Sequence, residues 1–170
     1  MKIEDSKING LKIITPEVFH DFRGEYVETY NEKYYEAALD IHFVQDDIST
    51  SRYGMARGLH GDETTWKLIQ CLYGSIYVAV IDMRKDSPTY LQHETFTIND
   101  KNRKQILVPA GCANGHMCMT DVCIFSYKQS TYYEGMHKQF TIKWNDERFN
   151  IYLPIPNPIL SERDSFKLKK

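Results

Sequence analysis

Long apolar runs are absent from this chain. None of its 170 residues belongs to a stretch approaching the 18 or more consecutive apolar residues of a membrane-spanning helix. An excess of one charge is also missing, because 21 Lys+Arg stand against 23 Asp+Glu, and the one basic group is Lys167, Lys169 and Lys170. This balance argues against a nucleic-acid or membrane-surface partner. The N-terminus lacks the apolar core of a signal peptide, so we expect a cytoplasmic protein.

Cysteine pairs with metal-ligand spacing are missing as well. The four cysteines form no C-x-x-C pair and stand among apolar neighbours: Cys71, Cys112, Cys118 and Cys123. Buried free thiols therefore explain them better than a zinc site. With 42% hydrophobic residues, a chain of this length buries roughly 70% of the surface of its unfolded form, which predicts one domain over residues 1–170.

Helical periodicity is scarce, and period two dominates. Val, Ile, Tyr, Phe and Thr recur at alternate positions in short segments separated by Gly, Pro and turn dipeptides, which is typical of antiparallel strands. Strands are expected within residues 11–15, 24–30, 42–45, 58–60, 66–72, 75–83, 91–98, 104–108, 115–119, 122–129 and 138–144. One short helix is expected after an Asn31 cap, with Tyr34, Tyr35, Ala38 and Leu39 on one face. Regularly spaced short strands indicate an all-β sandwich or jelly roll, with residues 154–170 wrapped around it.

One part of the chain follows the spacing of the cupin metal-site pattern but not its ligands. The pattern positions are filled by Gly54, His60, Asp62, Lys67, Gly74, Pro109, Gly111, Asn114 and Cys118. An ammonium at Lys67 cannot ligate a cation, which leaves His60 without a coordination set. The spacing therefore predicts a cupin-type jelly-roll β-barrel with short peripheral helices and a site that holds no metal.

A histidine and a lysine at a barrel mouth without a metal suit proton abstraction beside a carbonyl. Such a reaction needs a base that titrates near neutral pH, as histidine does, and a cation or phenol that stabilises the enolate. Taken singly, each residue also has a structural explanation. His60 then is a hydrogen-bonded barrel histidine, Lys67 a solvated strand residue, Tyr127 a packing residue, and Asp164 a turn cap.

Several motifs follow one another in one order: DFRGEYVE at 21–28, QDD at 45–47, RGLH at 57–60, KL at 67–68, VPAG at 108–111, YK at 127–128, WND at 144–146 and LSERD at 160–164. Together they resemble the dTDP-4-dehydrorhamnose 3,5-epimerase family, which acts on nucleotide-diphosphate 4-keto-6-deoxy sugars. The resemblance extends from about residue 15 to residue 164. It implies a homodimeric jelly roll that needs no cofactor and binds a nucleotide-diphospho-sugar.

The resemblance also implies residue roles. His60 is implied as the base that removes the proton from C3, and Asp164 as the carboxylate that orients it. Lys67 is implied to stabilise the enolate oxygen at C4, and Tyr127 to return a proton on the opposite face, as inversion requires. The implied substrate-binding residues are Arg23, Glu28, Gln45, Asp47, Arg57, Asn114 and Arg163, the first two in part across the dimer.

Departures from the family pattern lie near the expected pocket. Asn114 and Asp47 stand where the family usually has histidine and asparagine, and the residues from Gly61 to Trp66 are also unusual. His116 either replaces the missing ring or occupies an aromatic packing position. These departures favour a GDP-linked 4-keto heptose, as in Campylobacter-type capsule synthesis, over a dTDP-linked hexose. A C3-only epimerase, a 3,4-ketoisomerase, a metal-dependent cupin oxygenase and a sugar-nucleotide-binding cupin without activity stay open.

Overall fold

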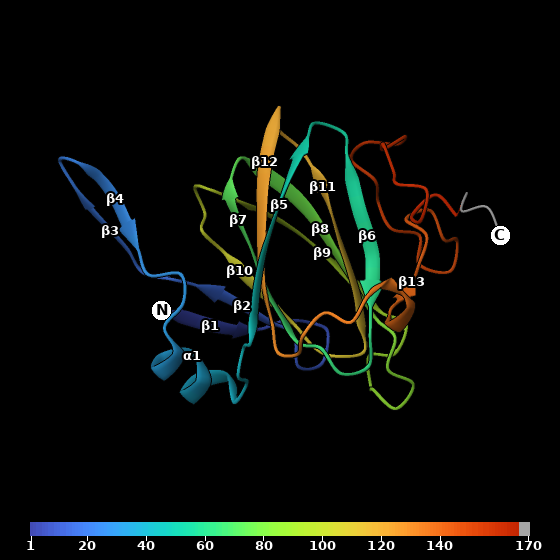
Figure 1. Ribbon diagram of the computed structural model, residues 1–170, viewed down its shortest axis with the longest axis horizontal. Coiled ribbons are helices and arrows are strands. Elements are labelled where there is room, and N and C mark those ends of the chain that lie inside the picture. Colours follow the sequence, from blue (N-terminus) through green and yellow to red (C-terminus); the bar gives the residue numbers. More distant parts are fainter. Residues whose placement is uncertain (167–170) are drawn as a thin grey trace.

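Two antiparallel sheets face each other in the computed structural model, which describes residues 1–166 (Figure 1). The strands are β1 (Lys2–Asp5), β2 (Lys12–Thr15), β3 (Val18–Asp21), β4 (Gly24–Val27), β5 (Gln45–Arg52), β6 (Ala56–Gly61), β7 (Lys67–Tyr73), β8 (Ser75–Asp82), β9 (His93–Asn99), β10 (Gln105–Val108), β11 (Cys112–Cys118), β12 (Val122–Gln129) and β13 (Phe140–Thr141). One sheet has the order β1-β2-β10-β7-β12-β5 and the other β13-β6-β11-β8-β9. This architecture confirms the predicted jelly-roll barrel.

Strand β8 is apolar at nearly every position because both of its faces are buried. Its even-numbered residues, such as Val78 and Val80, pack in the core between the two sheets. Its odd-numbered residues, such as Ala79 and Ile81, pack in a second core that includes Trp144. Because successive strand side chains point to opposite faces, a strand buried on both faces loses the polar–apolar alternation. The chain after β13 therefore covers the outer face of the five-stranded sheet.

The predicted helix exists as α1 (Glu32–Leu39), with two corrections. Asn31 occupies the N-cap position, but its side chain donates a hydrogen bond to Glu28 Oε2 (3.2 Å) instead of capping the helix. The apolar face is also narrower than expected, because Tyr34 and Ala38 are exposed. Tyr35 is buried and donates from its hydroxyl to Gln105 Oε1 (2.9 Å), which anchors the helix on the six-stranded sheet.

Several strand boundaries differ from the expected ones. The strand expected over 42–45 is β5, which starts at Gln45 and continues through a polar segment. Its less exposed alternate residues, Gln45, Asp47, Ser49 and Ser51, are all polar, and Ser49 lines a cavity. Residues 24–30 contribute only β4, which pairs with β3 in a separate hairpin that projects from the sheets (Figure 1). Strand β1 was not expected. The strand expected over 138–144 is shortened to β13, and a 3₁₀ turn, Met136–Lys138, precedes it.

The C-terminal segment lies along the barrel beside β6, as predicted (Figure 1). Backbone hydrogen bonds join the Ala56 amide to the Ile159 carbonyl (3.0 Å) and the Ile159 amide to the Gly54 carbonyl (2.8 Å). The basic residues Lys167, Lys169 and Lys170 lie outside the described residues. No helix within residues 1–166 has the length and apolar character needed to cross a membrane.

Candidate active site

A cavity of about 460 Å³ opens between the two sheets. Ser49, Lys67, Phe125, Tyr127 and Gln129 line it from the six-stranded sheet; Arg57, His60, Asn114 and His116 line it from the five-stranded sheet; and Ser161, Arg163 and Asp164 line it from the C-terminal segment. Segments distant in sequence therefore bring a histidine, a lysine, a tyrosine and a carboxylate together. The structure places all four predicted catalytic residues in one cavity.

A β-bulge gives strand β6 two cavity-facing side chains at an odd spacing. Asn114 pairs with His60, whereas His116, two residues later on β11, pairs with Arg57, three residues earlier on β6. The extra residue on β6 resets the alternation, so that Arg57 and His60 both line the cavity. The two strands approach too closely there for a side chain at Gly58, whose Cβ would lie 2.7 Å from the Asn114 carbonyl oxygen.

His60 and Asp164 form a hydrogen-bonded pair at one side of the cavity. His60 Nε2 lies 2.6 Å from Asp164 Oδ1, and the Gly58 amide donates to Asp164 Oδ2 (3.3 Å). Burial of Asp164 raises its pKa, but the hydrogen bond and charge of His60, with the bonds from Ser161 and Gly58, outweigh burial and leave the pKa lowered. An ionised Asp164 accepts the Nε2 proton of His60, which leaves Nδ1 with a free electron pair.

Lys67 is almost completely buried in the cavity wall. Its Nζ donates to Asn114 Oδ1 (3.4 Å), and its exposed fraction is 7%. Burial lowers the pKa of Lys67; the charge of Asp62 opposes this shift, and that of Arg163 adds to it. A poorly hydrated ammonium with one weak partner is suited to stabilise an oxyanion.

Tyr127 lines the cavity from β12, on the sheet opposite His60. Burial raises the pKa of its hydroxyl, and the nearby charges of Asp47 and Tyr133 add to the shift while Arg57 opposes it. The phenol therefore keeps its proton at neutral pH. It is available as a proton donor on the side of the cavity away from the histidine.

Gln45 and Asp47, predicted to bind substrate, lie behind the cavity lining. Asp47 Oδ2 accepts hydrogen bonds from Gln45 Nε2 (2.8 Å) and Gln129 Nε2 (2.9 Å), while the Tyr133 amide donates to Gln45 Oε1 (2.8 Å). Gln129 and Tyr133 line the cavity, but Gln45 and Asp47 do not. In this chain the pair holds two lining residues in place.

Two arginines line the cavity, and the structure fixes both. Arg57 donates from Nε to Ser51 Oγ (3.0 Å). Arg163 donates to Thr141 Oγ1 (3.1 Å) and to Gln139 Oε1 (3.3 Å). Their guanidinium groups give the cavity positive charge suited to an anionic group such as a phosphate.

Arg23 and Glu28 do not join this cavity within the chain. Arg23 lies on the turn of the β3–β4 hairpin and forms an exposed ion pair with Asp21 (2.5 Å). Glu28 follows β4 and accepts a hydrogen bond from Asn31. The β3–β4 hairpin projects away from the two sheets (Figure 1), and neither Arg23 nor Glu28 is among the residues that line the cavity of their own chain.

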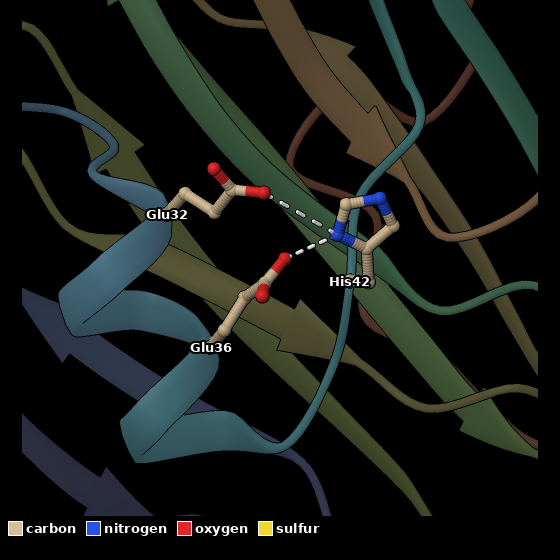
Figure 2. Close-up of side chains that lie close together, drawn as sticks. All are labelled: Glu32, Glu36 and His42. Atoms are coloured by element: carbon tan, nitrogen blue, oxygen red, sulfur yellow. Dashed lines mark hydrogen bonds and ion pairs between the residues drawn. The ribbon is translucent and has the colours of Figure 1, made fainter.

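One group at the surface of residues 1–166, on and just after α1, brings three metal-ligating atoms together. Glu32, Glu36 and His42 place these atoms within 4.8 Å of one another (Figure 2). His42 Nδ1 contacts the Glu36 carboxylate and lies 3.7 Å from Glu32 Oε1. The contacts of His42 with the two carboxylates account for the group, which is separate from the cupin ligand positions. The absence of a metal from the cavity stays a prediction.

The four cysteines are buried free thiols, as predicted. Burial raises the pKa of Cys71 and of Cys112 to about 12. Thiols that hold their protons so firmly are poor nucleophiles and poor metal ligands.

Comparisons with known proteins agree with this architecture. The family model for dTDP-4-dehydrorhamnose 3,5-epimerase matches residues 5–169. The chain is 34% identical to the dTDP-4-dehydrorhamnose 3,5-epimerase of Shigella flexneri over 96% of its own length and 93% of the relative's. The chain belongs to this family. It is accordingly an isomerase-class enzyme that acts on nucleotide sugars.

Solved structures of family members have the same fold as the chain. A dTDP-6-deoxy-D-glucose-3,5-epimerase from Legionella pneumophila, in complex with dTDP-4-keto-L-rhamnose, has a TM-score of 0.92 and 33% identity, with 97% of this chain and 90% of that chain covered. The dTDP-4-dehydrorhamnose 3,5-epimerase of Bacillus anthracis, with TDP and pyrophosphate bound, has a TM-score of 0.91 and 36% identity, with 96% and 95% covered. The expected GDP-linked heptose finds no support among these relatives, whose names specify dTDP or TDP.

Sequence reasoning missed some cavity residues of this epimerase-family chain. Phe125 and Gln129 lie two residues on either side of Tyr127, so the alternation of β12 already placed all three side chains on one face. Ser49 carried no usable signal, because its polar strand was not expected. Gln139 and Tyr133 come from the irregular segment between β12 and β13, whose path no local pattern indicates.

Replacing Asp164 with asparagine is expected to lower kcat by about 10²- to 10⁴-fold with little change in KM, because the amide no longer fixes the His60 tautomer or stabilises the imidazolium. The pKa of Asp164 is lower in the folded protein than its ordinary value of 3.8, so the ionised carboxylate stabilises the fold above pH 3.8. This stabilisation is lost as the pH falls through the folded-state pKa. Steady-state kinetics and urea unfolding at pH 7 test both effects. Asp46→Asn, in an exposed ion pair with Lys128, is the matched control. A kcat within twofold of wild type would exclude the positioning role.

Proposed function

We propose that this chain inverts C3 and C5 of a dTDP-linked 4-keto-6-deoxy hexose without a cofactor. The observation that carries the proposal is the placement of the His60–Asp164 pair and the Tyr127 phenol on opposite sheets of one cavity. Inversion needs a base on one face of the sugar and an acid on the other, because one residue alone exchanges the proton and restores the starting configuration.

The reaction follows from the protonation states of these groups. His60 Nδ1 removes the proton from C3, and the electron pair of the C–H bond moves into an enolate whose negative charge lies on the C4 oxygen. The Lys67 ammonium stabilises this oxygen. Tyr127 then donates its phenolic proton to the opposite face of C3, and solvent restores the proton to Tyr127 and removes the extra proton from His60. The same sequence at C5 completes the second inversion.

Nucleotide binding is proposed to use Arg57 and Arg163 on the diphosphate, with Asn114 on the sugar. Arg23 and Glu28 are proposed to reach the nucleotide of a second copy, because the projecting β3–β4 hairpin carries Arg23 away from its own cavity. This arrangement requires a homodimer. Sedimentation equilibrium showing only a monomer at micromolar concentration would contradict it.

The carrier is proposed to be dTDP, on the strength of the relatives' names. The GDP-linked heptose suggested by Asn114, Asp47 and the segment before Lys67 becomes the competing substrate in the test. A 3,4-ketoisomerase is less well supported, since moving the carbonyl does not need an acid on the opposite face of C3.

Proton NMR in D₂O tests the proposal directly. The purified protein is incubated with the dTDP-linked 4-keto-6-deoxy hexose and, separately, with the GDP-linked 4-keto heptose, and deuterium entry at C3 and C5 is followed. We expect entry at both carbons of the dTDP sugar. Entry at C3 alone would indicate a C3-only epimerase, and faster reaction of the GDP sugar would overturn the proposed carrier. Movement of the carbonyl, or no exchange with either sugar, would overturn the epimerase mechanism.

A further inference from the structure

Three buried side-chain nitrogen atoms within residues 1–166 have no hydrogen-bond partner: Arg103 Nε, His116 Nε2 and Trp144 Nε1. Of these residues only His116 lines the active-site cavity. Buried polar groups in folded proteins are almost always satisfied, and an exception at a binding cavity points to a partner that the ligand supplies. The mechanism proposed above leaves His116 without a role.

The imidazole of His116 is held firmly by stacking. It lies parallel to Phe125, with ring centroids 4.1 Å apart and an interplanar angle of 21°, and Phe125 in turn packs 5.2 Å from the Tyr127 ring. The stack crosses from β11 to β12 and ends at the proposed acid. A 180° rotation of the His116 ring about its Cβ–Cγ bond preserves this stacking and exchanges Nδ1 with Cδ2 and Nε2 with Cε1.

Packing alone does not account for a histidine at this position. Phenylalanine would stack on Phe125 equally well and would leave no polar atom unpaired. His116 is 3% exposed, and burial, with the nearby charge of Arg57, lowers its pKa to about 3. The ring is therefore neutral in the enzyme's working range and offers one hydrogen-bond donor and one acceptor.

We propose that His116 binds the C2 hydroxyl of the substrate's sugar ring and selects sugars that carry this hydroxyl. The inference rests on the proposed function. A neutral imidazole suits a hydroxyl, which both donates and accepts, whereas the anionic diphosphate suits the arginines of the cavity. The C3 hydroxyl changes sides during inversion, so a fixed residue cannot hold it in both substrate and product. The C2 hydroxyl keeps its configuration throughout the reaction.

The test compares the dTDP-linked 4-keto-6-deoxy hexose with its 2-deoxy counterpart, using wild-type protein and His116→Phe. Wild type is expected to prefer the 2-hydroxy sugar in kcat/KM by about 10- to 100-fold. The phenylalanine variant keeps the stack and is expected to lose most of this preference, through a fall with the 2-hydroxy sugar alone. His93→Phe, at the start of β9 and outside the cavity, is the control.

Each outcome decides between recognition and packing. A His116→Phe variant that keeps the wild-type preference, or loses rate equally with both sugars, would overturn hydroxyl recognition. Wild-type protein that exchanges neither sugar would instead overturn the proposed function on which the inference rests. Affinity for dTDP confirms that the variant is folded, and His116→Met, apolar and more adaptable, repeats the test where phenylalanine does not fold.

Discussion

His60→Asn is expected to abolish epimerisation and to remove deuterium exchange at both C3 and C5, each by at least about 10³-fold. The asparagine amide donates a hydrogen bond to Asp164 in place of Nε2, but it has no group that accepts a proton from carbon. Because His60 begins both inversions, no exchange is expected to survive at either centre. Proton NMR in D₂O and steady-state kinetics measure the two losses separately.

The expected loss is one of chemistry rather than of folding. His60 is partly exposed in the cavity, and its strand is held by β11 and β13 on either side. We therefore expect His60→Asn to bind dTDP with an affinity within about threefold of wild type, measured by calorimetry. His42→Asn, which removes an exposed histidine paired with α1, is the matched control. Near wild-type turnover by His60→Asn would show that another base acts.

The parts of the fold that were predictable are those where at least one face of the strand is apolar. The segments that became β7, β8 and β12 were expected within one or two residues of their observed ends, because they carry β-branched and aromatic residues between turns. The prediction for β5 was displaced because its inward residues are polar and lie at or behind the cavity lining, with no apolar residue among Gln45, Asp47, Ser49 and Ser51. A functional surface thus removed the apolar signal by which a strand is recognised.

The candidate site shows a similar division. The resemblance named His60, Lys67, Tyr127 and Asp164, and the fold brings them to one cavity. No local pattern could show that Arg57 and His60 share a face, since their odd spacing requires the bulge opposite Asn114 and His116. Nor could spacing show that Asp47 acts through Gln129, because that contact joins two strands far apart in the sequence.

Tyr127→Phe is expected to separate exchange from inversion. His60 can still remove the C3 proton and return a deuteron to the same face, so exchange at C3 should continue at a substantial fraction of the wild-type rate. Net inversion should fall by about 10²-fold or more, since the opposite face has lost its proton donor. The ratio of deuterium entry to product formation, followed by NMR in one sample, measures this uncoupling.

The ratio of deuterium entry to product formation also shows whether Tyr127 acts as a proton donor or only as a packing residue. Phenylalanine preserves the ring that packs 5.2 Å from Phe125, so the stack stays intact while the hydroxyl is removed. Tyr132→Phe, at a tyrosine that is 72% exposed, is the control and should change neither rate. Because burial raises the pKa of Tyr127, wild-type inversion should not decline through loss of the phenolic proton until the pH exceeds the ordinary tyrosine value of 10.0. Equal losses of exchange and inversion in Tyr127→Phe would mean that the phenol positions the substrate and that the second proton comes from another group.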